Sequence, residues 1–360
     1  MKTGARIAGL GWVTPLGASL DEVWDRLGRG DVAEAKIVTN PETGREHIYA
    51  PVPLKTVDAL ARNPRLRRSS AISYFAVAAG LAALQNAGIT LTPESAARTA
   101  IVFAISSGGV VYTRKFYEQI VKQGANVASP LLFPETVYNA PASHLAAQLG
   151  IDGASYTLVG DGTVGLGALK FAEQILATDD LDRVVVVGSE ECDWILCEAY
   201  REWRMARRVG STRGALLAEG AAAVVLAREG KVDLQVHEGA PVFRKREGEA
   251  ALSRIYADLL SGNGADAVIG CANGTFVDAI EQRALGRHAM GATVYLPKRS
   301  WGESFGASAL LQTVVAALTL EHGLLPGMAP ETVKIESVLV SALGFNQQAG
   351  GAVLRRANSV

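Results

Sequence analysis

Short apolar runs alternate with longer amphipathic segments along the whole chain, and this alternation predicts a layered α/β architecture. Runs rich in β-branched residues, such as residues 99–105 and 183–188, predict buried strands. Segments whose small and apolar residues recur at helical spacing, such as residues 69–88 and 307–322, predict buried helices. Further strands are expected over residues 6–13, 156–159, 221–227, 232–236, 267–271, 293–296, 337–341 and 352–355, and further helices over residues 20–27, 110–123, 139–149, 249–260 and 277–285.

The alternation of strands and helices runs through the chain twice, so two similar halves are expected, over residues 1–230 and 231–360. Residues 28–66 are less regular because prolines interrupt them, and we expect a surface excursion there. No short-period repeat or low-complexity tract accompanies this pattern. The sequence therefore predicts a layered α/β protein built from two successive halves.

A glycine-rich corner within residues 155–170 is the candidate functional feature of the chain. A β-prone run ends at Val159, and an Ala- and Leu-rich helical pattern follows Gly162, so strand turns sharply into helix at Asp161-Gly162. A helix N-terminus offers its backbone N–H groups and its dipole to an anion or a developing oxyanion. Gly162, however, has no side chain with which to attack a substrate.

Composition excludes several other classes of function. The chain has 35 Lys and Arg against 36 Asp and Glu, and the net charge of -1 gives no electrostatic footprint for nucleic acid. Cys192, Cys197 and Cys271 show no metal-ligand spacing and the histidines are scattered, so no metal site is expected. No segment reaches the ~18 consecutive apolar residues of a membrane span, and we expect a soluble cytoplasmic protein with buried, reduced thiols.

Landmark segments spread over nearly the whole chain resemble those of the β-ketoacyl synthases of the thiolase fold. Each segment alone is a weak signal, whereas their order and spacing together are specific. The segments that carry the resemblance are residues 9–17 and 129–142, Tyr156-Thr157, residues 218–222, Gly274-Thr275, Lys298 with Gly302 and Gly306-Ala307, and Gly344-Phe345.

The resemblance implies a fold and a set of partners. The family's fold is a five-layered αβαβα arrangement of two similar halves, with a dimer built beside the central strands. Acyl chains are delivered to the family's enzymes on an acyl carrier protein. For this chain the resemblance implies a ketosynthase partner or a second copy of itself, an acyl carrier protein whose phosphopantetheine is presented through the partner, and no cofactor bound by the chain.

The family's chemistry requires three residues, and this chain lacks all of them. The nucleophilic cysteine falls at Gly162, the first histidine at Asn273 and the second histidine at Glu303. Glycine offers no nucleophile, asparagine does not shuttle a proton near neutral pH, and an ionised glutamate is only an acceptor. We therefore predict that the chain does not catalyse decarboxylative condensation on its own.

The resemblance also assigns supporting roles to several residues. The backbone N–H groups of Gly162 and Phe345 are expected to form an oxyanion hole, which needs no side chains. Lys298 and Glu281 resemble a structural ion pair of the family. Asp161 is a candidate alternative base or nucleophile, although a turn or helix-cap role is commoner for such a residue.

Two other residues and one departure from the family enter the interpretation. Cys271 lies on an expected strand near Asn273 and is the cysteine with the strongest claim to a role, whereas His144 is expected to pack near the dimer face. Residues 346–349 replace the glycine-rich stretch that the family carries after Gly344-Phe345. This replacement changes the segment beside the expected oxyanion hole.

Three hypotheses of function stay open. The first is a non-catalytic ketosynthase-like subunit, similar to the chain length factors of type II polyketide systems, which pairs with an active β-ketoacyl synthase in polyketide or fatty acid-like biosynthesis. The second is an acyl-thioester hydrolase or transferase that uses Asp161, Glu303 or Cys271. The third is a homodimeric module that binds an acyl chain or a carrier protein.

Overall fold

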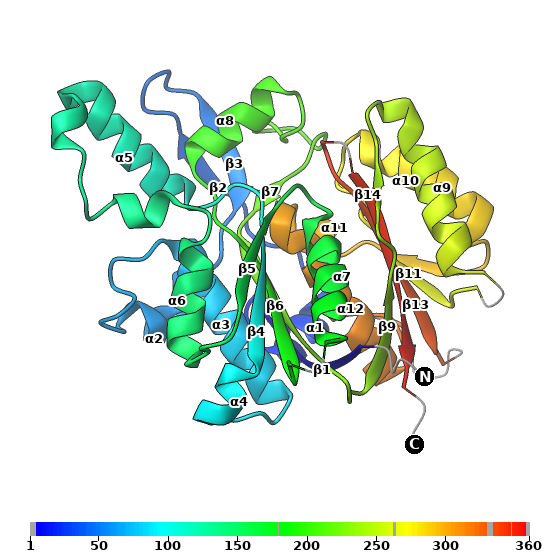
Figure 1. The fold of residues 1–360 in the computed structure, drawn as a ribbon. Helices are drawn as coiled ribbons and strands as arrows, with labels where there is room; N and C mark the ends of the chain where they lie inside the picture. Colours follow the sequence, from blue (N-terminus) through cyan, green and yellow to red (C-terminus); the bar gives the residue numbers. More distant parts are fainter. Residues whose placement is uncertain (1–4, 179, 262–263, 330–333, 347, 358–360) are drawn as a thin grey trace.

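The computed structural model describes residues 5–178, 180–261, 264–329, 334–346 and 348–357 (Figure 1). Their eleven-stranded mixed sheet has the order β12-β11-β13-β14-β9-β1-β8-β6-β4-β5, with β10 paired to β14. Its strands are β1 (Arg6–Val13), β4 (Thr99–Ile105), β5 (Ser155–Val159), β6 (Arg183–Glu190), β8 (Gly220–Ala227), β9 (Val232–Val236), β10 (Ala240–Pro241), β11 (Ala267–Ile269), β12 (Thr293–Tyr295), β13 (Ser337–Leu343) and β14 (Gln348–Arg356).

The two parts of this sheet share one strand order. In the first part β5, β4 and β6 are parallel, and β8 and β1 continue the sheet antiparallel. In the second part β12, β11 and β13 are parallel, and β14 and β9 continue it antiparallel. The parts meet where β1 pairs with β9 at Arg6–Asp233 and Ile7–Val232. The division of the chain at residues 230 and 231 falls between β8 and β9 and stays a prediction.

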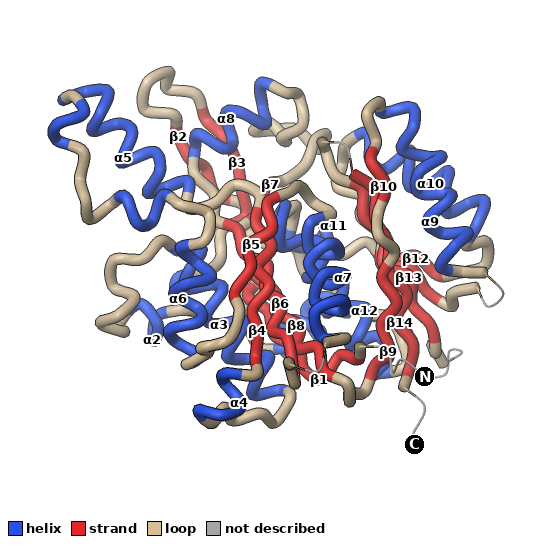
Figure 2. The backbone as a smooth tube through the Cα atoms, in the orientation of Figure 1, coloured by secondary structure: helices blue, strands red, loops and turns tan. Residues whose placement is uncertain are grey.

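Helices form three layers around the two parts of the sheet. Helices α3 and α6 cover the outer face of the first part, and α9 and α10 cover that of the second (Figure 1). Helices α7 and α12 lie between the two groups of strands and contact both (Figure 2). The expected five-layered, thiolase-like αβαβα fold is therefore confirmed. These helices are α3 (Ala71–Asn86), α6 (Ala140–Leu149), α7 (Val164–Leu176), α9 (Gly248–Leu259), α10 (Phe276–His288) and α12 (Phe305–His322).

The central layer explains why two helices of the sequence are apolar on every side. Sixteen residues of α12, from Phe305 to Leu320, are buried because strands cover the helix on two faces. Gly165 on α7 lets the central helices approach each other, since a Cβ at this position would lie only 3.0 Å from Cγ of Leu310. This packing holds the corner before α7 between the two parts of the sheet.

Residues 28–66 form an excursion from the main sheet, as expected, but they contain a hairpin that the sequence does not reveal. Strands β2 (Lys36–Thr39) and β3 (Glu46–Ala50) pair antiparallel, and β7 (Leu217–Ala218) pairs parallel with β3. Strands of four or five residues are too short for their side-chain alternation to stand out. The remaining helices are α1 (Leu20–Gly28), α2 (Asp58–Ala61), α4 (Pro93–Ala97), α5 (Val110–Gln123), α8 (Trp194–Glu202) and α11 (Lys298–Trp301), with short 3-10 turns η1 (Leu54–Thr56), η2 (Ala125–Val127), η3 (Phe133–Thr136) and η4 (Lys245–Glu247).

Helix ends agree closely with the sequence signals. The Ser19 hydroxyl accepts a hydrogen bond from the Glu22 N–H at 3.3 Å and caps α1, as the sequence predicts.

Across the described ranges, no helix combines the length and the apolar character that crossing a membrane requires.

Candidate functional site

The corner between β5 and α7 is a tight turn centred on Gly162. Asp161 Oδ1 accepts a hydrogen bond from the Thr163 N–H at 3.2 Å, which fixes the turn before the helix begins. Gly162 does not need to be glycine for steric reasons. A Cβ added to it would lie 3.8 Å from Cα of Gly344 and 3.9 Å from Oε1 of Glu303, which are ordinary contact distances, and its φ lies outside the left-handed region.

The two positions expected to carry histidines meet directly beside this corner. Asn273 follows β11, and Glu303 lies between α11 and α12. The Asn273 side-chain N–H donates to Glu303 Oε2 at 2.8 Å, and the Lys298 ammonium donates to the same oxygen at 2.7 Å. Glu303 Oε1 accepts from the Phe305 N–H at 3.1 Å and from the Ser308 hydroxyl at 2.5 Å. Four donors therefore hold the buried Glu303 carboxylate in place.

The three positions line one small cavity that this network closes. The space between them does not admit a water molecule. The side chains of Asn273 and Glu303 and their neighbours therefore fill the space next to Gly162. The cavity is lined by Asp161, Gly162, Tyr200, Asn273, Glu303, Phe305, Leu343, Gly344 and Phe345.

The expected ion pair between Lys298 and Glu281 is wrong. Lys298 pairs with Glu303, whereas Glu281 accepts from the backbone N–H groups of Cys271 at 2.7 Å and Ala272 at 3.0 Å. Burial of Lys298 by itself lowers its pKa, but the interactions with Glu303, Cys271 and Glu281 together outweigh burial, and the pKa is raised. The resemblance could not predict that Lys298 pairs with Glu303, because the family has a histidine and not a carboxylate at this position.

Cys271 is not accessible as a nucleophile in this arrangement. Its side chain is completely buried, with Sγ 3.5 Å from the Ser341 hydroxyl. Burial raises the pKa of the Cys271 thiol well above its ordinary value, which suppresses the reactive thiolate. Cys192 and Cys197 are also buried and have raised pKa values, in agreement with their expected packing role.

Asp161 combines the turn role with a place in a second, larger cavity. Its Oδ2 accepts from the Asn346 N–H at 3.0 Å and packs so closely on Gly344 that a Cβ on that glycine would lie 1.7 Å away. Burial raises the pKa of Asp161, although hydrogen bonds from Asn346 and Thr163 act in the opposite direction.

The backbone donors expected to form an oxyanion hole are both present at the closed cavity. Among the described residues, no acceptor takes the N–H of Gly162 or that of Phe345. Both residues line the cavity, but the structure holds no oxyanion against which the pair can be measured. The oxyanion hole therefore stays a prediction.

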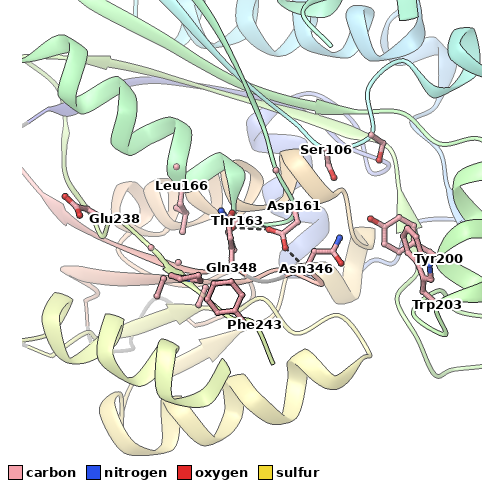
Figure 3. A pocket seen from close by; sticks show the side chains of 18 of the residues that line it. Ser106, Asp161, Thr163, Leu166, Tyr200, Trp203, Glu238, Phe243, Asn346 and Gln348 are labelled. Atoms are coloured by element: carbon pink, nitrogen blue, oxygen red, sulfur yellow. Dashed lines mark hydrogen bonds between the residues drawn. The ribbon is translucent and has the colours of Figure 1, made fainter. Parts of the chain in front are cut away.

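The larger cavity lies on the other side of Asp161 and Tyr200 and is open. Its volume is about 730 Å³ (Figure 3). Aromatic residues among its lining that the sequence interpretation missed are Tyr200, Trp203 and Phe243. They were missed because the end of α8, which carries Tyr200 and Trp203, and the segment after β10, which carries Phe243, meet only in the folded chain. The lining residues are Ser106, Ser107, Val110, Gly160, Asp161, Thr163, Leu166, Gly167, Leu196, Ala199, Tyr200, Trp203, His237, Glu238, Gly239, Ala240, Pro241, Phe243, Asn346, Gln348, Ala349 and Gly350.

The buried carboxylate of Glu190 holds part of the wall of this cavity. Glu190 is fully buried and accepts from the backbone N–H groups of Ser106 and Ser107. Its burial raises its pKa to about 8. A second buried carboxylate, Glu219 of the 218–222 segment, lies away from this wall. It accepts from the Val52 N–H at 3.0 Å and the Cys192 N–H at 3.3 Å, and burial raises its pKa to about 7. The sequence offered no signal for Glu190, because an acidic residue at the end of an apolar strand normally faces solvent.

The remaining titratable candidates do not form a further reactive centre. His144 Nε2 lies 2.6 Å from Glu135 Oε1 and 3.2 Å from the Ser69 hydroxyl. Because both contacts use the same ring nitrogen, the three side chains do not form a proton relay. In the part of the chain that the structure describes, no group of three or more metal-ligating side chains could hold a metal ion.

Comparisons with known proteins agree with the fold. The family model described as "Beta-ketoacyl synthase, N-terminal domain" matches residues 5–231. The 3-oxoacyl-[acyl-carrier-protein] synthase 2 of Coxiella burnetii (strain RSA 493 / Nine Mile phase I) is 22% identical, over 97% of this chain and 98% of that protein. The putative polyketide beta-ketoacyl synthase 2 of Streptomyces cyaneus is 27% identical, over 89% of this chain and 85% of that protein.

A solved structure extends the similarity to nearly the whole fold. The ishigamide ketosynthase/chain length factor superposes with a TM-score of 0.82 at 17% sequence identity, over 99% of this chain and 100% of that chain. The family model alone covers more than half of the sequence, and the structural neighbour has the same five-layered arrangement. The chain therefore belongs to the β-ketoacyl synthase family.

Proposed function

We propose that the chain is a non-condensing ketosynthase-like subunit that pairs with an active β-ketoacyl synthase in type II polyketide or fatty acid-like biosynthesis. The main observation behind this proposal is the closed cavity, in which Gly162, Asn273 and Glu303 do not supply the cysteine nucleophile or the histidine proton shuttles of the family. The similarity to a ketosynthase/chain length factor structure supports this role as far as the fold is concerned.

The network at the closed cavity also opposes a hidden condensing activity. Condensation needs a group that carries the acyl chain and a donor that polarises the extender unit. Glu303 is engaged by four donors, so its carboxylate is occupied by the protein itself. The acyl group, carried on the phosphopantetheine of an acyl carrier protein, would therefore react at the cysteine of the partner ketosynthase.

The exposed edge of the first part of the sheet supports pairing with another chain. β5 is the last strand of the described sheet on this side, and Tyr156 and Val159 on it are 40% and 56% exposed. Helix α5 projects from the same half of the molecule and has no buried residue (Figure 1). An exposed edge strand next to an apolar surface favours association. The exposed apolar residues of this arm, from α5 to η3 and beyond, are Tyr117, Val121, Val127, Leu131, Phe133, Val137 and Tyr138.

Co-expression with ketosynthases that retain the cysteine and both histidines tests the proposal. We expect a one-to-one complex by analytical ultracentrifugation, and a condensation product that forms only when both chains are present. Val159→Asp should weaken the complex, because it places a charge in the apolar face beside β5. Val294→Asp is the matched control, since Val294 is 44% exposed on β12, the corresponding edge strand of the second part.

Two results would overturn the proposal. One is a chain that forms only homodimers beside every ketosynthase tested, which would favour the homodimeric binding module. The other is condensation by the purified chain alone. If Val159→Asp and Val294→Asp weaken the complex equally, the partner does not bind at β5.

A second candidate function, acyl-thioester hydrolysis or transfer, is favoured by one observation. Asp161 is a buried carboxyl with a raised pKa that lines an open cavity, which is a common setting for a general acid or base. Glu303 and Cys271 are weaker candidates, because the first is held by four donors and the second is fully buried. Mass spectrometry after incubation with acyl thioesters should show turnover that Asp161→Ala abolishes; absence of turnover and of an acyl adduct removes this candidate.

A further inference from the structure

Helix α5 lies on the surface of the molecule without contributing to its core. Within the described chain, none of the residues from Val110 to Gln123 is buried, and the helix packs mainly on η2, η3 and α8 (Figure 1). Among the described residues, the apolar core clusters contain no member of α5. A helix with so little buried apolar surface opens locally at a low free-energy cost. Its position therefore depends on a small number of specific contacts.

Two acidic side chains that follow β6 hold the first turns of α5. Glu191 is fully buried, and its Oε1 accepts a hydrogen bond from the Val111 N–H at 3.0 Å. Arg114 Nε lies 3.1 Å from each carboxylate oxygen of Asp193, and the two side chains are 22% and 8% exposed. A negative charge beside a helix N-terminus is favourable, and breaking a largely buried ion pair is costly. Glu191 and Asp193 therefore fasten the N-terminal half of α5 to the rest of the chain.

The segment before α5 is held separately. Ser106 and Ser107 donate their backbone N–H groups to the buried Glu190 carboxylate. These two serines line the open cavity together with Val110, but only Val110 belongs to α5. Gly108 lies between them and has a φ of 73°, which glycine adopts with little strain. The part of the cavity wall that Glu190 holds and the part that α5 supplies thus meet at Gly108.

A second glycine follows the other end of α5. Gly124 has a φ of 91° and a ψ of 160°, a combination that is essentially restricted to glycine. A Cβ added to Gly124 would meet open space, so packing does not confine this residue. Residues at the ends of elements absorb the changes in φ and ψ when an element moves. Glycines therefore bound α5 at both ends, whereas its ties to Glu191 and Asp193 lie near its N-terminus.

We propose that α5 is a hinged helix that turns about Gly108 and Gly124. Glu191 and Asp193 hold its docked position, which is the position in this structure. In the docked position Val110 completes the wall of the open cavity. When α5 leaves this position, Val110 leaves the wall, and the part of the wall that Glu190 holds stays in place.

Pairing with a second chain favours the docked position. Tyr117 and Val121 on α5 are 59% and 83% exposed, and the exposed edge strand β5 belongs to the same half of the chain. A partner that covers these side chains stabilises the position of α5 in which they are presented to it. This part of the inference rests on the proposed function, with an active ketosynthase as the partner, whereas the hinge rests on contacts within the chain. Pairing would thereby regulate the wall of the open cavity.

Hydrogen exchange of the purified full-length chain tests the hinge, with mass spectrometry of overlapping peptides as the readout. At a concentration at which the chain is monomeric, the amides of α5 should exchange faster than those of the buried central helix α12. Arg114→Gln removes the ion pair with Asp193 and should speed exchange across α5 at least about tenfold. Ser106 and Ser107 lie on the other side of Gly108, and their exchange should stay as in the wild-type chain.

Two matched controls separate the hinge from a general loss of stability. Lys122 pairs with Glu118 of the same helix and is 64% exposed, so Lys122→Gln should change the exchange of α5 by less than about threefold. Gly124→Ala strains the docked backbone and should speed the exchange of α5 about fivefold or more. Gly88→Ala should leave α5 unchanged, because Gly88 also has a positive φ and open space around its Cβ position but follows α3.

Each outcome decides the inference. Equal exchange of α5 in Arg114→Gln and Lys122→Gln overturns the role of the ion pair, and faster exchange at Ser106 and Ser107 together with α5 overturns the hinge at Gly108. If Arg114→Gln fails to fold, the wild-type comparison of α5 with α12 and the Gly124→Ala result decide the hinge.

The complex with an active ketosynthase tests the coupling to pairing. We expect the exchange of α5 to slow at least about tenfold in the complex, because binding to one position reduces the population of the other. A complex that forms without this slowing overturns the coupling and leaves the proposed function standing. If no complex forms, the proposed function and the coupling both fail, and the exchange of the chain alone still decides the hinge.

Discussion

The closed cavity and the open cavity share a wall but are built in opposite ways. Around Gly162, charged and polar side chains point inward and satisfy one another, with Glu303 at the centre of the network. At the open cavity, the buried Glu190 carboxylate accepts hydrogen bonds from the backbone N–H groups of Ser106 and Ser107, which belong to the cavity wall. The first arrangement fills the space next to Gly162, and the second keeps a space clear.

The difference shows that the scaffold around the corner is kept although Gly162, Asn273 and Glu303 stand at its centre. Replacing an imidazole by the Glu303 carboxylate gives the buried Lys298 a partner at 2.7 Å, so the position now contributes to internal charge balance. Asp161, one residue before Gly162, connects the two regions because it lines both cavities. Asp161 therefore lies between the network next to Gly162 and the open cavity.

The largest expected effect comes from breaking the closed cavity. Glu303→Ala leaves the buried Lys298 ammonium and the Asn273 amide without their acceptor, and we expect a loss of about 3–5 kcal/mol in unfolding free energy. Denaturant unfolding of the purified variant measures the loss. The double change Lys298→Met with Glu303→Leu should be less destabilising, because it removes both charges together.

An exposed ion pair supplies the control for this prediction. Lys334 and Glu336 form a pair at 2.8 Å whose side chains are 61% and 52% exposed, so Glu336→Ala should change stability by less than about 1 kcal/mol. A loss at Glu303 as small as that at Glu336 would show that the network does not hold the closed cavity together.

The sequence predicts the fold better than the site. The β-branched runs and the buried helices are strong signals, and the strand over Arg6–Val13 and the helix over Val110–Gln123 have the bounds that the pattern indicates. The pairing of short strands such as β2 and β3 cannot be predicted from the sequence, because it depends on contacts across a turn and not on the alternation of apolar and polar residues.

At the site, the resemblance places residues correctly but misses their new partners. Gly162, Asn273 and Glu303 do line one cavity, as the order of the motifs predicts. The pairing of Lys298 with Glu303 instead of Glu281 depends on a carboxylate in the second histidine's position, which only the geometry reveals. Tyr200, Trp203 and Phe243 could not be assigned to the open cavity, because tertiary packing alone brings their segments together.

A smaller effect is expected at the wall of the open cavity, where stability should depend on pH. The pKa of Glu190 is about 8 in the folded chain and about 4.5 in the unfolded chain, so its contribution is fully present below pH 4.5 and is lost as the pH rises toward 8. We expect wild-type stability to fall by roughly 2–3 kcal/mol more than that of Glu190→Gln between pH 5 and pH 8. Thermal unfolding of both proteins at several pH values measures this difference. Both proteins contain Glu219, so its contribution cancels when the two stabilities are subtracted. A difference that stays constant with pH would mean that Glu190 is already ionised in the folded chain.

The smallest expected effect on stability comes from restoring the nucleophile alone. Gly162→Cys should change the unfolding free energy by less than about 1 kcal/mol, because its Cβ meets Gly344 and Glu303 only at 3.8 and 3.9 Å. The new thiol would face the Glu303 carboxylate without an imidazole, which raises the thiol pKa and disfavours the thiolate. We therefore expect no condensation and slow alkylation by iodoacetamide at pH 7, measured by mass spectrometry against the wild-type chain, whose three cysteines are buried. Rapid alkylation or condensation by this variant would show that the closed cavity opens to reagents and substrates. The side chains around Gly162 would then not keep this cavity permanently closed, and the contrast with the open cavity would fail.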